Sequence, residues 1–210
     1  MISPQERTLA IIAGRYDPST DTGYYGFVDS TNLITGDLLA KQLDFNVGIN
    51  RSSDAGWLKF YVGPNAVCNN TDHQRVIYVA RTPLKYSVSW DDINNADLIF
   101  GNRNIDIGNN TYQVRLLTGG NERFGTGSEW NELLYRVCIA RLADGGKWDI
   151  YDDMGLHSGL NGLASWAPEI DGSSTFRRVI RGYSDITTWN TAASSHTSSY
   201  FGWRPVLELV

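Results

Sequence analysis

Cysteine and histidine are scarce in this chain, and their scarcity argues against several kinds of protein. The 210 residues include two cysteines and three histidines. Two cysteines are too few for a disulfide-stapled fold, and the sequence leaves open whether Cys68 and Cys138 pair or stay as buried thiols. His73, His157 and His196 lie far apart without a short ligand spacing. We therefore expect no histidine metal site and no metal-dependent catalysis.

Runs of basic residues and long apolar runs are also missing. Eighteen Lys and Arg stand against 23 Asp and Glu, which gives a net charge of -5. This balance does not favour a nucleic-acid partner, because nothing would neutralise the phosphates. The most apolar stretch near the N-terminus, Leu9–Ala13, is far shorter than the ~20 residues of a membrane-spanning helix and lacks the basic start of a signal peptide. We expect neither membrane insertion nor signal-directed export.

Aromatic residues and glycine, in contrast, are abundant. The chain has seven Trp, eleven Tyr and 21 Gly, and its 41% of hydrophobic residues are enough to bury a core. Glycine, with the many Asn and Ser residues, favours turns, while Tyr and Trp serve either a core or a contact surface. Because no linker or repeat divides the sequence, we expect one domain over residues 1–210.

Capping patterns predict three helices. The first covers Ile34–Leu43, where Thr35 has the side chain of an N-cap. A second, short helix follows Ser89. The third begins at Thr126, whose spacing to Glu129 matches a capping box.

Alternating and β-branched runs predict short antiparallel strands. Residues 84–90 alternate between large apolar and small or charged side chains, as a half-buried strand does. The other predicted strands are a hairpin of Trp57–Val62 with Arg75–Ala80, a hairpin within Asp106–Leu117, and a last strand in Trp203–Val210. Polar and glycine-rich sequence from residue 143 to the last strand predicts mostly loop. The chain is thus an α+β protein, with hairpins in residues 1–125 and long C-terminal loops in 126–210.

Four motifs of the C-terminal half occur in a family-specific order. They are Ser128–Tyr135, Tyr151–Met154 with Gly162–Trp166, Arg178–Gly182, and Gly202–Arg204. This order resembles the C-type-lectin-like fold, in the branch shared by formylglycine-generating enzymes and the tropism determinants of some phages. The resemblance implies a C-type-lectin-like domain.

A second resemblance, which covers most of the chain, is to virion or tail-associated proteins of tailed phages. The similar segments are Gly23–Phe27, Ile34–Asp37, Trp57–Phe60, Pro83–Trp90 and Gly202–Leu209. This resemblance implies a virion protein, assembled in the host cytoplasm and placed on the tail or capsid surface. Other virion proteins would be its partners, and we expect a symmetric homo-oligomer on the particle.

The sequence gives little support to an enzyme. The oxidase branch of the resembling family has paired cysteines near its closing Gly-aromatic-Arg motif, and residues 190–202 contain none. A Gly-X-Ser-X-Gly motif is missing, and the many acids do not single out a glycosidase pair. We therefore expect no catalytic residue and no cofactor, with an enzyme of the formylglycine-generating or hydrolase kind as the least favoured alternative.

Carboxylates near the C-terminal motifs leave calcium as an open possibility. Asp149, Asp152, Asp153 and Asp171 could supply oxygen ligands from loops. The same side chains suit helix caps and turns, which is the interpretation we favour.

The segment 183–201 has the composition of a contact surface, with rigid aromatics among adaptable hydrogen-bonding residues. The tropism determinants place their variable contact residues in the corresponding region. We expect binding to a host cell-surface glycan or protein, or to a neighbouring virion subunit, through Tyr183, Thr187, Trp189, Asn190, His196, Tyr200 and Phe201. The alternatives are a loop packed on its own aromatics and a purely structural decoration or collar protein. We interpret Glu129, Trp130, Arg181 and Arg204 as structural.

Overall fold

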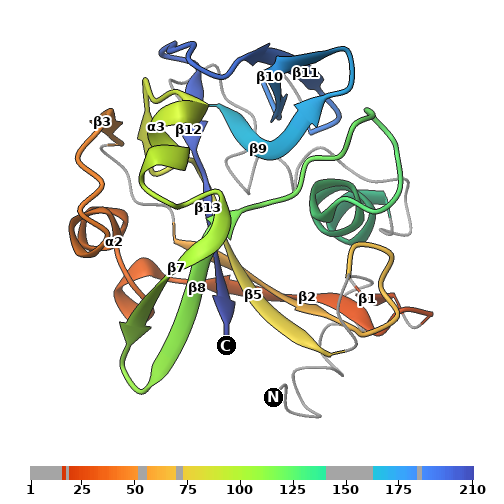
Figure 1. Ribbon diagram of the computed structural model, residues 1–210. Helices are drawn as coiled ribbons and strands as arrows, with labels where there is room; N and C mark the ends of the chain where they lie inside the picture. Colours follow the sequence, from red (N-terminus) through yellow and green to blue (C-terminus); the bar gives the residue numbers. More distant parts are fainter. Residues whose placement is uncertain (1–15, 18, 52–55, 70–72, 141–162, 184–185) are drawn as a thin grey trace.

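Two β-sheets form most of the structure, a computed structural model, and a few short helices pack beside them (Figure 1). The structure describes residues 16–17, 19–51, 56–69, 73–140, 163–183 and 186–210. This mixed architecture, rich in antiparallel strands, confirms the predicted α+β class.

The larger sheet has seven strands and runs antiparallel throughout. In spatial order they are β1 (Tyr16–Asp17), β2 (Thr22–Val28), β4 (Trp57–Val62), β5 (Arg75–Ala80), β13 (Pro205–Leu209), β8 (Asn110–Leu116) and β7 (Phe100–Ile107). The predicted hairpins are confirmed as β4–β5 and β7–β8. The last strand, β13, lies in the middle of the sheet and joins the two hairpins.

The second sheet is built largely from the C-terminal part of the chain. Its strands in order are β11 (Trp189–Ala193), β10 (Ser174–Arg181), β9 (Ala164–Asp171), β12 (Phe201–Trp203), β6 (Lys85–Tyr86) and β3 (Ile49–Asn50). The prediction of mostly loop before the last strand was therefore wrong for the described residues. These strands do not alternate: β9 begins with four consecutive buried residues, and β10 with mostly exposed Ser, Thr, Phe and Arg.

Two short helices follow the predicted caps. The Thr35 hydroxyl accepts a hydrogen bond from the Leu38 N–H at 3.3 Å and begins α2 (Gly36–Gln42). Ser89 and Asp92 form a capping box at α3 (Trp90–Asn95). The predicted strand over residues 84–90 is reduced to β6, because Ser87 adopts a left-handed backbone with φ of 55° and ends it.

The third helix begins later than its capping pattern predicts. The π-helix η2 covers Trp130–Ala140, and the Ser128 hydroxyl accepts a hydrogen bond from the Asn131 N–H at 3.2 Å. The prediction of a Thr126–Glu129 capping box was wrong, because the Glu129 side chain forms buried ion pairs instead. A single 3-10 turn, η1 (Ser30–Asn32), completes the described helical segments.

Two groups of buried side chains form the core. The first draws on both sheets, α2 and α3, and includes Leu39, Trp57, Trp90, Trp166 and Trp203. The second lies between the larger sheet and η2, and includes Phe60, Val79, Trp130, Leu133 and Val206. Each group combines residues from before and after position 125, so the two halves of the chain share both cores.

Trp130 is closely surrounded at the start of η2. Its indole N–H donates to the Ile186 carbonyl at 2.7 Å, and its ring centroid lies 5.6 Å from the Arg181 guanidinium carbon and 5.5 Å from that of Arg204. At Gly182, which has a φ of 78°, an added Cβ would lie 2.8 Å from the Trp130 ring. Both the backbone angle and the indole therefore require glycine here.

We predict that Gly182→Ala lowers the free energy of unfolding by about 3 kcal/mol, because it combines left-handed strain with overpacking against Trp130. Urea unfolding followed by tryptophan fluorescence measures the loss. Gly108→Ala is the control, since Gly108 has a φ of 61° but nothing within 4 Å of an added Cβ. It should lose only about 1 kcal/mol. Equal losses in the two variants would show that the indole contact does not matter.

Candidate functional site

The predicted contact surface contains two aromatic pairs. The rings of Tyr183 and Tyr200 meet edge to face with centroids 5.3 Å apart, and both side chains are nearly half exposed, at 44% and 45%. The exposed His196 ring lies 5.3 Å from that of Phe201. Phe201 also packs at 5.0 Å against the buried Trp166, so the second pair is anchored in the core.

The other predicted contact residues differ in their exposure. Thr187 is buried, and its hydroxyl accepts hydrogen bonds from Arg123 at 2.7 and 3.2 Å, so it is a structural contact rather than a surface one. Trp189 is half-buried and donates its indole N–H to the Gly120 carbonyl at 2.9 Å. Asn190 lies exposed on β11. Thr187 and Trp189 thus hold residues 120–123 against this surface.

Arg181 has the structural role that the sequence suggests. Its guanidinium is fully buried and donates to the carbonyls of Glu122 and Arg123 at 3.1 and 3.3 Å, and to Asn131 Oδ1 at 2.6 Å. These bonds tie β10 to the segment before η2. Arg204 is equally buried and lies between β12 and β13, where the chain passes from one sheet to the other.

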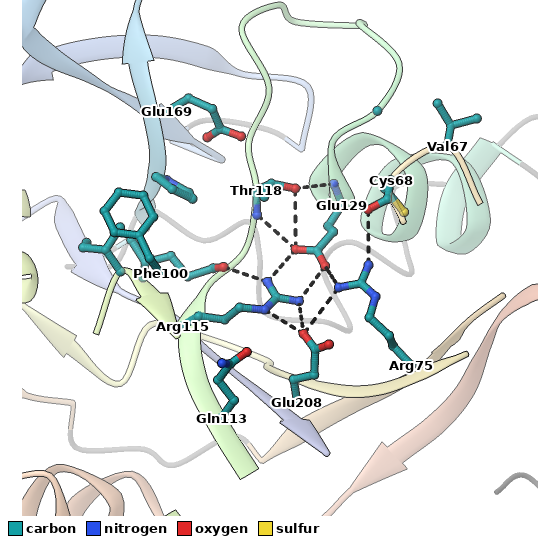
Figure 2. A pocket seen from close by; sticks show the side chains of 14 residues that line it. Val67, Cys68, Arg75, Phe100, Gln113, Arg115, Thr118, Glu129, Glu169 and Glu208 are labelled. Carbon is teal, nitrogen blue, oxygen red and sulfur yellow. Dashed lines mark hydrogen bonds and ion pairs between the residues drawn. The ribbon is translucent and has the colours of Figure 1, made fainter. Parts of the chain in front are cut away.

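A cavity of about 560 Å³ is the feature that the sequence did not reveal. Side chains from β5, β8, β9, β13 and the start of η2 meet around it (Figure 2). Its charged residues are Arg75, Arg115, Glu129, Glu169 and Glu208. Apolar side chains, among them Phe100 and Pro168, complete the lining.

Four of these charged side chains form one network. The Glu129 carboxylate accepts hydrogen bonds from Arg115 at 2.6 and 2.7 Å and from Arg75 at 3.1 Å. Glu208 accepts from the same two arginines at 2.8 and 3.3 Å. Burial acts to raise the pKa of Glu129, but the two arginines outweigh it and hold the pKa below its usual value.

Glu169 lies at the side of this network, in a different environment (Figure 2). Its carboxylate accepts from the Gly119 N–H at 2.9 and 3.0 Å and from the Gly120 N–H at 3.0 Å. Burial raises the pKa of Glu169, and these hydrogen bonds offset the rise only in part.

Opposite pKa shifts of two carboxylates in one cavity are typical of acid–base catalysis. Here, however, the Glu129 side chain is 2% exposed and its oxygens are occupied by Arg75, Arg115 and Thr118. Glu129 is therefore poorly placed to take a proton from a bound substrate.

The remaining candidates for chemistry have local structural roles or lie outside the described residues. Cys68 carries a free, buried thiol whose pKa burial raises to about 12, which makes it unreactive at neutral pH. The side chains of Cys138 and His157 are not among the described ones.

No helix within the described ranges is long and apolar enough to span a membrane.

Of the four possible calcium ligands, only Asp171 is described, and it stabilises a turn. Its carboxylate accepts from the N–H and hydroxyl of Ser173 at 3.0 and 2.9 Å, and from the Thr191 hydroxyl at 3.1 Å. Asp149, Asp152 and Asp153 lie outside the described residues. In the part of the chain that is described, no three His, Cys, Asp or Glu residues gather to hold a metal ion.

Comparison of the chain with protein-family models, with curated proteins and with solved structures gives no match. The function of the chain has to be inferred from its own residues.

We predict that Glu129→Gln lowers the free energy of unfolding at pH 7 by roughly 3 to 5 kcal/mol, because it removes the carboxylate that both arginines share. The folded-state pKa of Glu129 lies below its ordinary value. Its stabilisation is therefore complete above that ordinary value and is lost as the pH falls through the folded-state pKa. The difference between variant and wild type should shrink from pH 7 to pH 3 in urea unfolding.

Glu122→Gln is the control, because the Glu122 side chain is exposed. It should change stability by less than about 0.5 kcal/mol at either pH. A Glu129→Gln deficit that stays constant from pH 7 to pH 3 would contradict the assignment of the shifted pKa.

Proposed function

We propose that the chain is a non-enzymatic structural protein of a tailed-phage virion, with one C-type-lectin-like domain that binds another macromolecule through Tyr183 and Tyr200. The order of the four C-terminal motifs and the similarity of the N-terminal segments to virion proteins support this proposal. The mixed architecture of two sheets and few helices is compatible with such a domain.

The exposed Tyr183–Tyr200 pair is the observation that carries the proposal. Two large rings are each nearly half exposed, yet their edge-to-face contact fixes them against each other. Rigid aromatic side chains bury a large area at a low cost in conformational entropy, and they dominate many binding surfaces.

The surroundings of this pair favour a preorganised surface. Thr187 and Trp189 bind residues 120–123, and Arg181 joins the same segment to β10. Contact side chains supported by such bonds lose little freedom on binding.

The bound macromolecule is either a host surface glycan or protein, or a neighbouring virion subunit in a symmetric assembly. In a purely structural decoration or collar protein, the same aromatic pair would lie against other subunits in every particle. An enzyme is supported less, because residues 190–202 lack the cysteine pair of the oxidases and the Glu129 carboxylate is occupied.

Imaging and peptide mapping of purified virions test whether the chain is part of the particle, and its absence from the particle would refute the proposal. The proposed binding role predicts that Tyr183→Ala and Tyr200→Ala each weaken the contact with the host receptor or with the neighbouring subunit at least tenfold. Each should cost no more than about 1 kcal/mol of folding stability, since half of each ring is already exposed. Adsorption of variant virions to host cells measures receptor binding, and particle yield measures subunit contacts.

Phe176→Ala is the matched control, because Phe176 is 77% exposed on β10 and is not part of the pair. It should leave adsorption and yield unchanged. Loss of adsorption with normal yield indicates a host receptor, whereas loss of yield indicates a neighbouring subunit. If both tyrosine variants behave like Phe176→Ala, the pair is not a contact surface.

A further inference from the structure

The charges around the cavity in Figure 2 do not balance. Its lining has two arginines and three glutamates. Arg75 and Arg115 each bind both Glu129 and Glu208, so their positive charges are used within the network. The third carboxylate, Glu169, remains, and in its ionised form it gives the cavity one excess negative charge that disfavours an anionic ligand.

Glu169 is fixed in place but lacks a cation. The N–H groups of Gly119 and Gly120 orient its carboxylate, and no ion pair joins it to a Lys, Arg or His among the described residues. A carboxylate offers about four lone-pair positions, so acceptor capacity remains beyond these two donors. A half-buried charge without a counter-ion is unfavourable, and a cation entering the cavity would relieve that cost.

The cavity also has an apolar wall that suits an organic cation. Phe100 is 59% exposed and lines the cavity with Pro168. Its ring is held against Trp90, with centroids 6.2 Å apart. An aromatic face attracts ammonium and guanidinium groups and packs against their alkyl stems. A volume of about 560 Å³ accommodates a group the size of a long side chain.

We infer that this cavity binds an organic cation, a primary ammonium or guanidinium group, with Glu169 as its counter-ion and Phe100 as its apolar wall. Such a group reaches the cavity either as a Lys or Arg side chain of a partner protein or as a free polyamine. The inference does not depend on the proposed virion function.

Calorimetry on the full chain tests this inference with four probes: the N-acetyl amides of lysine and arginine, spermidine, and inorganic phosphate. We expect cation binding and no phosphate binding. Binding of the amino-acid amides but not spermidine identifies a partner's side chain, and the reverse identifies a free polyamine. Glu169→Gln should weaken the binding at least tenfold, and Phe100→Ala roughly two- to fivefold.

Asp171→Asn is the matched control, because it also converts an acid on β9 to an amide but lies outside the cavity lining. It should leave cation binding unchanged, as should Tyr200→Ala, which separates this site from the aromatic pair. If Glu169→Gln does not fold, Phe100→Ala and the wild-type probe series still decide the question. The inference is overturned if no cation binds the wild-type chain, or if both cavity variants bind as tightly as Asp171→Asn.

Discussion

The buried carboxylate of Glu129 is the contact on which the arrangement of this protein depends. Through Arg75, Arg115 and Glu208 it joins the start of η2 to β5, β8 and β13, and Arg75 and Glu208 are 133 residues apart in the sequence. Buried charges are tolerated only when each one is paired with an opposite charge and hydrogen-bonded. Because Trp130 follows directly, the same network sets where the indole enters the second core.

Local signals in the sequence were sufficient where the partners of a residue are its neighbours. The caps at Thr35 and Ser89 bind N–H groups three residues ahead, and both helices were predicted correctly. Thr126 has the same spacing to Glu129, but the Glu129 carboxylate binds Arg75 and Arg115 instead of forming a capping box. A spacing rule cannot detect that competition, because it depends on partners from β5 and β8.

The candidate site shows the same limit. Composition and the family resemblance pointed to the region of Tyr183 and Tyr200, but the burial of Thr187 depends on Arg123, 64 residues away. The charges of the cavity come from five separate segments, so no sequence window contains them. Likewise β9 and β10 have no apolar alternation, and they are recognisable as strands only once their pairing is known.

Gly120 connects the two candidate sites. Its N–H donates to Glu169 at the cavity, and its carbonyl accepts from Trp189, one of the predicted contact residues. Its neighbour Gly119 has no room for a side chain, since an added Cβ would lie 2.7 Å from that of Ala167. The short glycine segment therefore links Glu169, which lines the cavity, to Trp189 on β11.

The central position of β13 also has a consequence for how the chain is made. Residues 205–209 separate β5 from β8 and supply Glu208, while the preceding β12 completes the other sheet. During translation the two hairpins are finished long before these residues leave the ribosome, and each must wait with one unpaired edge. Each sheet therefore gains all of its strands only after β12 and β13 have been synthesised.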